Sequence, residues 1–576
     1  MHRKSETVKL LRKEYLKKRV IITFMFIIIF TSVLQYCVRN ILFEHMVIYN
    51  STVRGIKRGI INKDERSKIL IIPEGVKSIG TNAFIDNTDI EEVVLPESLV
   101  SIEDYAFAGC TGLKKIKFPQ GLKKIGPFSF FGCESLEDIV FPDSLEYLIG
   151  GSFAGCVNLK KVDFSESKTY IGLMTFKNCT SLKEVQLSEN LTEIQKEAFY
   201  NCISLEKIYI PFNTQNIGSQ AFMDCKNLKE VILNREDILL GAGAFINTLW
   251  LSKLPTDDGY KYFSNILMKY EGNERKVTVK DGIKSIAGGA FFDSPTLEEV
   301  VLPESLTVIG GSAFSCCQKL SYIDIPDNVE LMGNKVFEAC DSLERIVLPD
   351  RLRSLPQYSF HQCKNLKEVV LGSDLKDILD NSFAECENLK SINLNDKTRY
   401  IGEGAFEGCK KLTDIGDSSG VSFVGYNALD DTPWYSSQEE VDGCKYIGNV
   451  LIECLDKKKT DIRLKEGTTM IGDLAFEGTK IYSLDFAKGI KIIGYRAFEN
   501  CSNLSFAVIP DGVQYLGYDV FSSCKNLREI YVPESVERVQ VEVFGNGIFD
   551  NYKNIAVPNH LSGMFIYNGK ARIKYY

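Results

Sequence analysis

The chain has 576 residues, of which 44% are hydrophobic, and a formal net charge of −8 at pH 7. The apolar share is ordinary for a buried core, and the acidic balance argues against nucleic acid as a partner, because phosphate binding needs a basic face. Only four histidines occur, and they lie too far apart in the sequence to suggest a triad or a metal site. We therefore predict no catalytic, cofactor-binding or metal-binding residues, and we do not expect an enzyme.

The N-terminus has the pattern of a membrane anchor. Residues 1–19 carry eight basic and two acidic side chains, and residues 20–38 carry no charge and are rich in Ile and Phe. Such a stretch spans about 28 Å as a helix, enough to cross a bilayer core, and the basic flank places the N-terminus in the cytoplasm. We predict a basic cytoplasmic tail over 1–19, an uncleaved transmembrane signal-anchor helix over 20–38, and an exterior linker and N-terminal cap over 39–66. A cleaved signal peptide, giving a secreted protein, is the alternative, although residues 34–37 offer no small-x-small site.

From residue 84 onward a phenylalanine recurs at a constant step. The first series is Phe84, Phe107, Phe130, Phe153, Phe176, Phe199, Phe222 and Phe245, and the second is Phe291, Phe314, Phe337, Phe360, Phe383 and Phe406, with Leu429 in the next place. A last set, Phe476, Phe498, Phe521 and Phe544, departs once by a single residue. A fixed period of about 23 residues is typical of a solenoid, in which each repeat is one coil stacked on its neighbours. We predict a repeat solenoid over 67–558 and a C-terminal cap over 559–576.

Each coil has a recognisable internal order. Ile116 and Phe118 alternate with polar residues, which predicts a short parallel strand with one buried face. Pro119 ends that strand, because proline has no N–H for a ladder. Phe130 and Cys133 follow at a spacing of three, which predicts a short helical turn that buries both side chains. One coil alone cannot bury these residues, so the coils must stack.

The repeated pattern L-x-x-I-x-L-P-x-x-L-x-x-I-G-x-x-A-F-x-x-C-x-x-L resembles the BspA-like leucine-rich repeat, found in surface proteins of bacteria and some parasitic protists. The resemblance runs from about residue 69 to about residue 558. It implies a leucine-rich-repeat solenoid. It also implies a surface adhesin or binding receptor, without catalytic residues to carry over.

Thirteen of the 17 cysteines stand three residues after a repeat phenylalanine. Many cysteines outside a cell usually suggest disulfides. Here the fixed position in every coil favours small buried hydrophobes that remain free thiols. Bonds between adjacent coils are the alternative, although the dihedral demands of a disulfide would strain a regular stack.

Two inserts interrupt the period, near 248–280 and 432–465. The first holds Trp250, Lys261-Tyr262, Asn265 and Leu267, and the second repeats them in the same order as Trp434, Lys445-Tyr446, Asn449 and Leu451. The offset is the same for every pair and equals eight coils, which indicates a longer duplication. Each insert is predicted to be a β-hairpin. Either its tryptophan closes the edge of the core, or the hairpin projects as a binding element.

Two further patterns bear on function. Gly416–Gly420 matches G-x-S-x-G, but it falls between two repeat strands rather than at a strand-to-helix turn, so it does not predict a nucleophile. Within the strands, the residue between the last two buried positions should point outward. Reading it along the chain gives Lys117, Val140, Asp163, Gln186, Tyr209 and Ile232, then Val301, Asp324, Val347, Val370 and Asn393, and finally Tyr531.

The apolar members of this set form the candidate ligand face: Val140, Tyr209, Ile232, Val301, Val347, Val370 and Tyr531. Strand propensity accounts for part of the pattern, since Val and Tyr are good strand formers. The predicted function is a membrane-anchored adhesin or protein-binding receptor with its repeats outside the cell. Its partners would be proteins or glycans at another cell or matrix surface, and it would act as a monomer without a cofactor. A carbohydrate- or cell-wall-binding scaffold is the alternative.

Overall fold

A computed structural model describes residues 46–49, 51–56, 68–164, 167, 170–235, 237–485, 489–539, 554–558, 561 and 572–575. The span predicted over 20–38 lies outside these residues. Among the residues that are described, no helix is long and apolar enough to cross a membrane. The chain divides into two compact units, one comprising residues up to Thr214 with Phe222–Ile232 and Asn247–Leu249, the other Gln215–Ala221, Leu233–Ile246 and Trp250–Tyr576.

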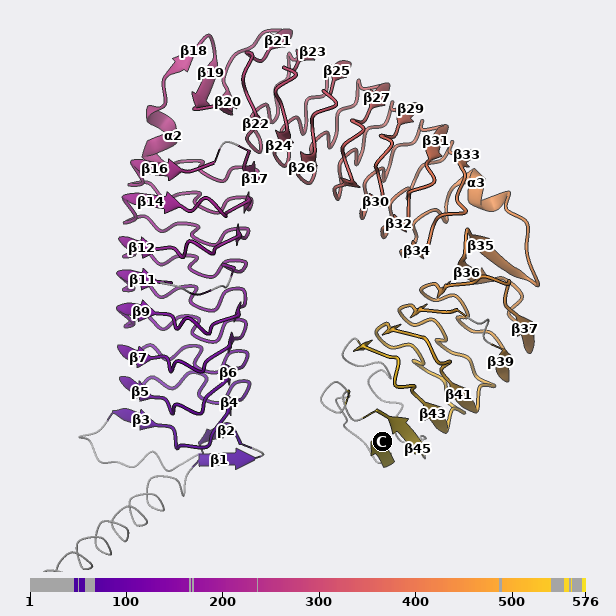
Figure 1. Cartoon of the computed structure of the whole chain (residues 1–576), viewed down its shortest axis with the longest axis horizontal. Coiled ribbons are helices and arrows are strands. Elements are labelled where there is room, and N and C mark those ends of the chain that lie inside the picture. The colour runs from indigo at the N-terminus through magenta and orange to yellow at the C-terminus, as the bar shows by residue number, and fades with distance from the viewer. Residues whose placement is uncertain are drawn as a thin grey trace, which may run out of the picture. The chain divides into compact units, whose positions relative to one another are not determined.

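The first unit is a stack of coils with two rows of short parallel strands. The longer row is β3 (Ile69–Ile71), β5 (Glu92–Val94), β7 (Lys115–Lys117), β9 (Asp138–Val140), β11 (Lys161–Asp163), β12 (Glu184–Gln186), β14 (Lys207–Ile210) and β16 (Glu230–Leu233). The shorter row is β4 (Ser78–Ile79), β6 (Ser101–Ile102), β8 (Lys124–Ile125), β10 (Tyr147–Leu148) and β13 (Glu193–Ile194). A hairpin of β1 (Met46–Tyr49) and β2 (Thr52–Ile56) pairs with β4. Figure 1 shows the longer row along one side of the stack.

The second unit repeats both rows. Its longer row contains β21 (Lys276–Thr278), β23 (Glu299–Val301), β25 (Tyr322–Asp324), β27 (Arg345–Val347), β29 (Glu368–Val370), β31 (Ser391–Leu394), β33 (Asp414–Gly416), β37 (Asp461–Arg463), β39 (Ser483–Asp485), β41 (Phe506–Val508), β43 (Glu529–Tyr531), β45 (Asn554–Val557) and β46 (Arg572–Tyr575). Its shorter row contains β15 (Asn216–Ile217), β17 (Leu239–Leu240), β22 (Ser285–Ile286), β24 (Val308–Ile309), β26 (Leu331–Met332), β28 (Ser354–Leu355), β30 (Asp377–Ile378), β32 (Tyr400–Ile401), β34 (Phe423–Val424), β38 (Met470–Ile471), β40 (Ile492–Ile493), β42 (Tyr515–Leu516) and β44 (Arg538–Val539).

Partners in these rows are equivalent residues of neighbouring coils, as in the pairing of Val300 with Ile323. The side chain in the middle of each three-residue strand points inward, because successive side chains alternate between the two faces of a strand. Val300 is fully buried, for example. The predicted solenoid of stacked parallel strands is therefore confirmed.

The repeat phenylalanines form columns of stacked rings through the cores. Neighbouring ring centroids are 5.0–5.8 Å apart from Phe84 to Phe222 and 5.0–5.4 Å apart from Phe291 to Phe406. Both Phe153 and Phe360 are fully buried, as the period predicts. These distances suit the offset stacking that aromatic pairs prefer. Phe544 lies outside the described residues.

The short helical turn predicted in each coil is wrong. The segment that carries the phenylalanine and the cysteine is a series of turns, and the only α-helices in the described part of the chain are α2 (Leu249–Lys253) and α3 (Pro433–Ser436). Phe107 donates its N–H to Ser129 of the next coil at 2.7 Å, whereas Cys110 donates to Phe107 of its own coil at 3.2 Å. Because alternate N–H groups bond to the next coil, a continuous helix cannot form.

This alternation is accompanied by left-handed backbone on each side of the phenylalanine. In the coil of Phe107, the φ angles of Tyr105 and Gly109 are 54° and 71°. The same two positions are left-handed in the coil of Phe337, at Lys335 and Ala339. A right-handed helix tolerates no such residue in its interior.

Both inserts are β-hairpins, as predicted. The first consists of β18 (Thr256–Asp257), β19 (Tyr260–Phe263) and β20 (Ile266–Tyr270), and the second of β35 (Cys444–Ile447) and β36 (Val450–Cys454). The inner strand of each hairpin pairs in parallel with the shorter row, β20 with β22 and β36 with β38. Trp250 is buried, with its ring centroid 5.1 Å from that of Phe245. The tryptophans therefore close the core, and the inner strands of the hairpins continue the stack.

Candidate ligand-binding face

The candidate face is built from the third residue of strands in the longer row. In the first unit these are Val140 on β9, Tyr209 on β14 and Ile232 on β16, and in the second Val301 on β23, Val347 on β27, Val370 on β29 and Tyr531 on β43. Six of the seven are exposed, and the Val140 side chain is the most open at 60%. Ile232 is half-buried and offers less surface than its position predicts.

Register decides which of these residues meet. Val347 and Val370 lie directly opposite each other on β27 and β29. Val140 is instead next to Asp163, and Val301 is next to Asp324. The face is therefore a column in which apolar and polar residues are mixed without a regular order.

Three further apolar residues, which are not among the seven predicted, belong to the same column. Ile71 and Val94 are exposed neighbours on β3 and β5, and Val508 is exposed beside Tyr531 on β41 and β43. The sequence could have revealed them, because each directly follows a buried residue of its strand, as the seven predicted residues do. Ile71 and Val94 extend the candidate column to the start of the first unit.

Charged residues beside this column pair across neighbouring coils. In the first unit, Lys207 and Glu230 are 2.6 Å apart. In the second unit, Lys276 and Glu299 are 2.7 Å apart, and Arg345 and Glu368 are 3.2 Å apart. Exposed pairs of this kind add little to stability. They do cancel charge locally. The apolar residues therefore lie beside a row of ion pairs, here called the ladder, that has almost no net charge.

Among the acidic side chains of the first unit, Glu91 has a strongly lowered pKa. Hydrogen bonds from Lys114 and Lys68, on either side of it, lower the pKa of Glu91 to about 2. Its carboxylate is 2.6 Å from the Lys114 ammonium. The Glu91 carboxylate therefore stays ionised down to about pH 2.

A groove of about 540 Å³ crosses the longer row of the first unit. Its apolar lining includes Val93, Ile116 and Phe118, with the exposed Val94 beside them. Residues of both charges, Glu92, Lys115 and Asp138 among them, also line it. Such a surface can accept an apolar side chain of a partner and bond to polar groups around it.

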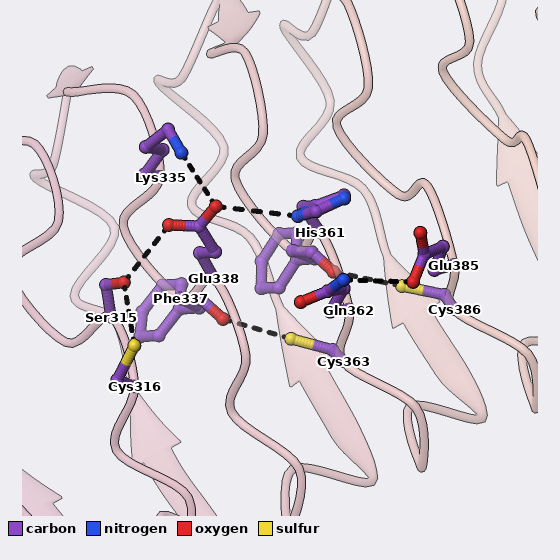
Figure 2. A network of polar contacts seen from close by, with 11 residues as sticks. Ser315, Cys316, Lys335, Phe337, Glu338, His361, Gln362, Cys363, Glu385 and Cys386 are labelled. Atoms are coloured by element: carbon purple, nitrogen blue, oxygen red, sulfur yellow. Dashed lines mark hydrogen bonds and ion pairs between the residues drawn. The ribbon is translucent and has the colours of Figure 1, made fainter. Parts of the chain in front are cut away.

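Figure 2 shows a polar network on the turn segments of the second unit. Glu338 lies at its centre, 2.7 Å from Lys335 Nζ, 3.3 Å from Ser315 Oγ and 3.5 Å from His361 Nδ1. The Cys316 thiol contacts Ser315 at 3.7 Å, so Glu338 separates it from His361. The network joins three consecutive coils, and within it the Cys316 thiol does not contact His361. Among the described residues no group of three or more His, Cys, Asp or Glu could hold a metal ion.

The G-x-S-x-G match lies between β33 and β34, as expected from its alignment. The N–H of Ser419 donates to the Asp417 carboxylate at 2.8 Å, which closes a local turn. Val421 and Val424, which follow, are buried like their counterparts in other coils. This segment replaces the usual proline turn of a coil.

The repeat cysteines have a structural role that the sequence suggested only in part. Each is buried, and its thiol donates to the carbonyl of the phenylalanine in the preceding coil. Cys133 Sγ is 3.2 Å from the Phe107 carbonyl and Cys363 Sγ is 3.0 Å from the Phe337 carbonyl, for example. Burial raises the pKa of Cys363 to about 12, so this thiol stays protonated. A protonated, hydrogen-bonded thiol is a poor nucleophile.

The lysine that recurs at the same place in both inserts is buried and bonds to the end of a short helix, a role that its repetition did not predict. Lys445 donates to the carbonyls of Tyr435 and Ser436 at 3.0 and 3.2 Å, at the end of α3. Lys261 takes the same place in the first insert, 3.5 Å from the Ser252 carbonyl on α2. Both residues are 8% exposed. Their repetition between the two inserts indicated the position alone.

A family model described as "BspA type Leucine rich repeat region (6 copies)" matches residues 56–179, 150–274, 268–390, 332–451 and 445–564. These matches cover most of the sequence. The chain belongs to the BspA-type leucine-rich-repeat family, as the sequence pattern predicted.

Several solved structures are similar in fold. A leucine-rich cell surface protein from Faecalibacterium prausnitzii is 23% identical, with 69% of this chain and 96% of that chain covered and a TM-score of 0.30. A leucine-rich repeat protein from Bacteroides ovatus is 21% identical, with 92% and 97% covered and a TM-score of 0.24. The pneumococcal vaccine antigen PcpA is 21% identical, with 67% and 93% covered and a TM-score of 0.27. No curated protein matches the chain.

Proposed function

We propose that this protein is a cell-surface binding protein, an adhesin or protein receptor, whose ligand face is the outward column of the longer strand row. The observation that carries the proposal is the exposure of valine and tyrosine at a position where solvent favours charge. Exposed apolar patches that are surrounded by polar residues mark interaction sites. The paired charges beside the column lower the cost of covering it, because they already satisfy one another.

The groove of the first unit supports a protein ligand. Its apolar floor consists of the exposed Val94, the buried Val93 and the half-buried Ile116, and lysines and carboxylates surround it. Protein interfaces combine an apolar centre with a polar rim in the same way. Binding here needs no cofactor, and we expect the protein to act as a monomer.

We further propose that residues 20–38 anchor the protein in the cell membrane by a single span, with the N-terminus in the cytoplasm and the repeats outside. The support is the uncharged stretch and the eight basic residues before it. Protease added to intact cells should then remove the repeats and leave a short membrane fragment. Protected repeats would contradict this topology, and a mature N-terminus near residue 40 would favour the secreted alternative.

A glycan or cell-wall ligand is the second candidate, because aromatic side chains gather near the end of the second unit. Phe506 and Tyr531 are exposed on the adjacent strands β41 and β43, and Val508 lies opposite Tyr531. Flat rings of this kind can stack on the apolar faces of sugars. Competition by free glycans, but not by matrix proteins, would favour this candidate.

The test of the ligand face uses cells that display the full chain on surfaces coated with matrix proteins or with glycans. Changing Val347 and Val370 together to Asp should lower retention on the protein surface about tenfold, since two apolar contacts of about 0.7 kcal/mol each are lost. The matched control is Phe292→Asp, which changes an exposed apolar side chain on a turn segment of the same unit. Equal retention of all three proteins, or an equal loss with the control, would contradict the proposed face.

A further inference from the structure

Two cysteines outside the repeat pattern face each other in the second insert. Cys444 begins β35 and Cys454 ends β36, and the antiparallel register places them directly opposite each other. Both are thiols in this structure and both are fully buried. Their neighbours in the strands, Lys445 and Glu453, form the next pair.

The backbone makes this a non-hydrogen-bonded pair. The Cys444 N–H donates to the Val441 carbonyl at 3.1 Å, and the Val441 N–H donates to the Cys444 carbonyl at 2.8 Å, so both polar groups of Cys444 point away from β36. The Cys454 N–H points away from β35 and donates to the Ala475 carbonyl at 2.7 Å. In such pairs the two Cα atoms lie about 4.5 Å apart and the side chains approach most closely. Disulfides accept Cα separations of about 4.4–6.8 Å.

The two thiols differ from the repeat cysteines in their hydrogen bonds. Repeat thiols have a carbonyl acceptor at close range, as Cys524 has in Phe498 at 3.0 Å, and a disulfide would remove that bond. Cys444 and Cys454 reach only the carbonyls of Asp442 and Asp456, at 3.9 and 3.8 Å. They also contact each other, and this thiol–thiol hydrogen bond raises the pKa of Cys444 and lowers that of Cys454. The repeat cysteines Cys501 and Cys524 share such a bond, but each of them also has a phenylalanine carbonyl, at 3.1 and 3.0 Å. An S–S bond between Cys444 and Cys454 would therefore replace only weak contacts.

The first insert provides a natural comparison. Tyr260 and Tyr270 occupy the equivalent positions there, and they face each other across β19 and β20. Their ring centroids are 4.9 Å apart. The open end of that hairpin is thus closed by an aromatic contact, where the second insert has two sulfur atoms.

We propose that Cys444 and Cys454 form a disulfide that closes the hairpin of the second insert, while the repeat thiols remain free. The oxidant is a small-molecule disulfide, RS–SR. The Cys454 thiolate attacks one of its sulfurs, the S–S bond breaks, and RS⁻ leaves. The Cys444 thiolate then attacks the Cys454 sulfur of the mixed disulfide and releases the second RS⁻. The two protein protons end on the two thiols RSH, which also carry the two electrons.

The exchange takes place during folding, before the hairpin packs against the next coil. In the folded chain both sulfurs are buried, so neither an oxidant nor a reductant can reach them. The finished bond should accordingly resist reduction until the protein unfolds.

The test uses the full-length chain, purified in detergent, unfolded under reducing conditions and refolded in a glutathione buffer that contains both redox forms. Alkylation in denaturant without reductant, followed by peptide mapping, should find 15 of the 17 cysteines alkylated and one cross-linked peptide pair joining Cys444 to Cys454. Alkylation of both residues, or a cross-link between either one and a repeat cysteine, would overturn the proposal.

Three variants separate the bond from its surroundings. Cys386→Ser removes one repeat thiol, so the cross-link should remain and the alkylated count should fall by one. Cys444→Ser should leave Cys454 alkylated. Replacing both residues with Tyr, as in the first insert, should give a protein whose thermal midpoint does not change with reductant, whereas the wild-type midpoint should fall when the bond is reduced in the unfolded chain. A wild-type midpoint that is insensitive to reductant would also count against the bond.

Discussion

A regular coil and an insert fill the same core by different means. In a coil such as that of Phe360, the ring stacks on its own copies in the two neighbouring coils, at 5.3 and 5.4 Å. In the first insert, Tyr270 takes the place beside Phe291, with a centroid distance of 5.2 Å and a tilt of 38°. The coil is held by repetition of one contact, whereas the insert is held by a set of different ones.

The difference affects how each region responds to substitution. A change in a coil damages the same contact twice, because each ring has two equivalent neighbours. A change in an insert removes a contact that occurs once. The two inserts also differ from each other, which allows a paired measurement at equivalent positions of the two hairpins.

The largest effect is expected from Phe360→Ala in a coil. The buried ring leaves a cavity and takes with it two aromatic contacts, so the cost should be about 3–5 kcal/mol in the free energy of unfolding. Urea unfolding followed by circular dichroism measures it, and the transition should broaden or split if neighbouring coils uncouple. Phe292→Ala, at an exposed ring in the same unit, is the control and should cost less than about 0.5 kcal/mol. A small effect at residue 360 would contradict the stacked column.

A smaller effect is expected from the buried lysines, and it should separate the two inserts. Lys445→Met removes two hydrogen bonds to the carbonyls at the end of α3 and should cost about 1.5–3 kcal/mol. Lys261→Met removes a single longer bond and an ion pair with Glu271 at 3.6 Å, so it should cost less. The same urea titration compares them. An equal or larger loss at residue 261 would show that the two inserts do not differ in this way.

Much of this comparison could be predicted from the sequence. The constant step between phenylalanines indicated the buried columns, and the constant offset between the inserts marked the two hairpins. Both signals arise because a position that is buried in every coil needs an apolar residue. Such residues therefore recur in the sequence at the spacing of the coils.

The turn segment could not be predicted in the same way. Its geometry depends on hydrogen bonds to the next coil, such as that from Phe107 to Ser129. The spacing of three between the phenylalanine and the cysteine, which suggested a helix, contains no information about these bonds. Gly109 and Asn178 do favour left-handed backbone, but Tyr105 and Met174 adopt it without any such preference. That Cys444 and Cys454 lie opposite each other could likewise not be predicted, because it depends on the register of the hairpin.

A third measurement contrasts the half-buried carboxylate of Asp473, near the second insert, with the exposed ladders. Burial raises the pKa of Asp473 to about 6, from a usual value of 3.8. Because the folded pKa is the higher one, this group favours folding at low pH, and its contribution becomes unfavourable as the pH rises from about 4 to 6. Asp473→Asn keeps an acceptor for the Tyr495 N–H and should stabilise the protein by about 1–2 kcal/mol at pH 7.5 but not at pH 4. Urea titrations at several pH values test it, and a gain that is independent of pH would contradict the cause given.

The smallest effect is expected from Glu91, and its pH dependence should have the opposite sign. Lys114 and Lys68 lower the pKa of Glu91 to about 2, below its usual value of 4.5. A lowered folded pKa gives stability that is present above about pH 4.5 and is lost as the pH falls toward 2. Glu91→Gln should therefore lower the thermal midpoint slightly at pH 7, and the difference from wild type should vanish near pH 2. Because the ladder is exposed, high salt should also reduce the difference at pH 7. If the midpoint of Glu91→Gln equalled that of wild type at pH 7 in low salt, the ladder would neutralise charge beside the ligand face without stabilising the stack.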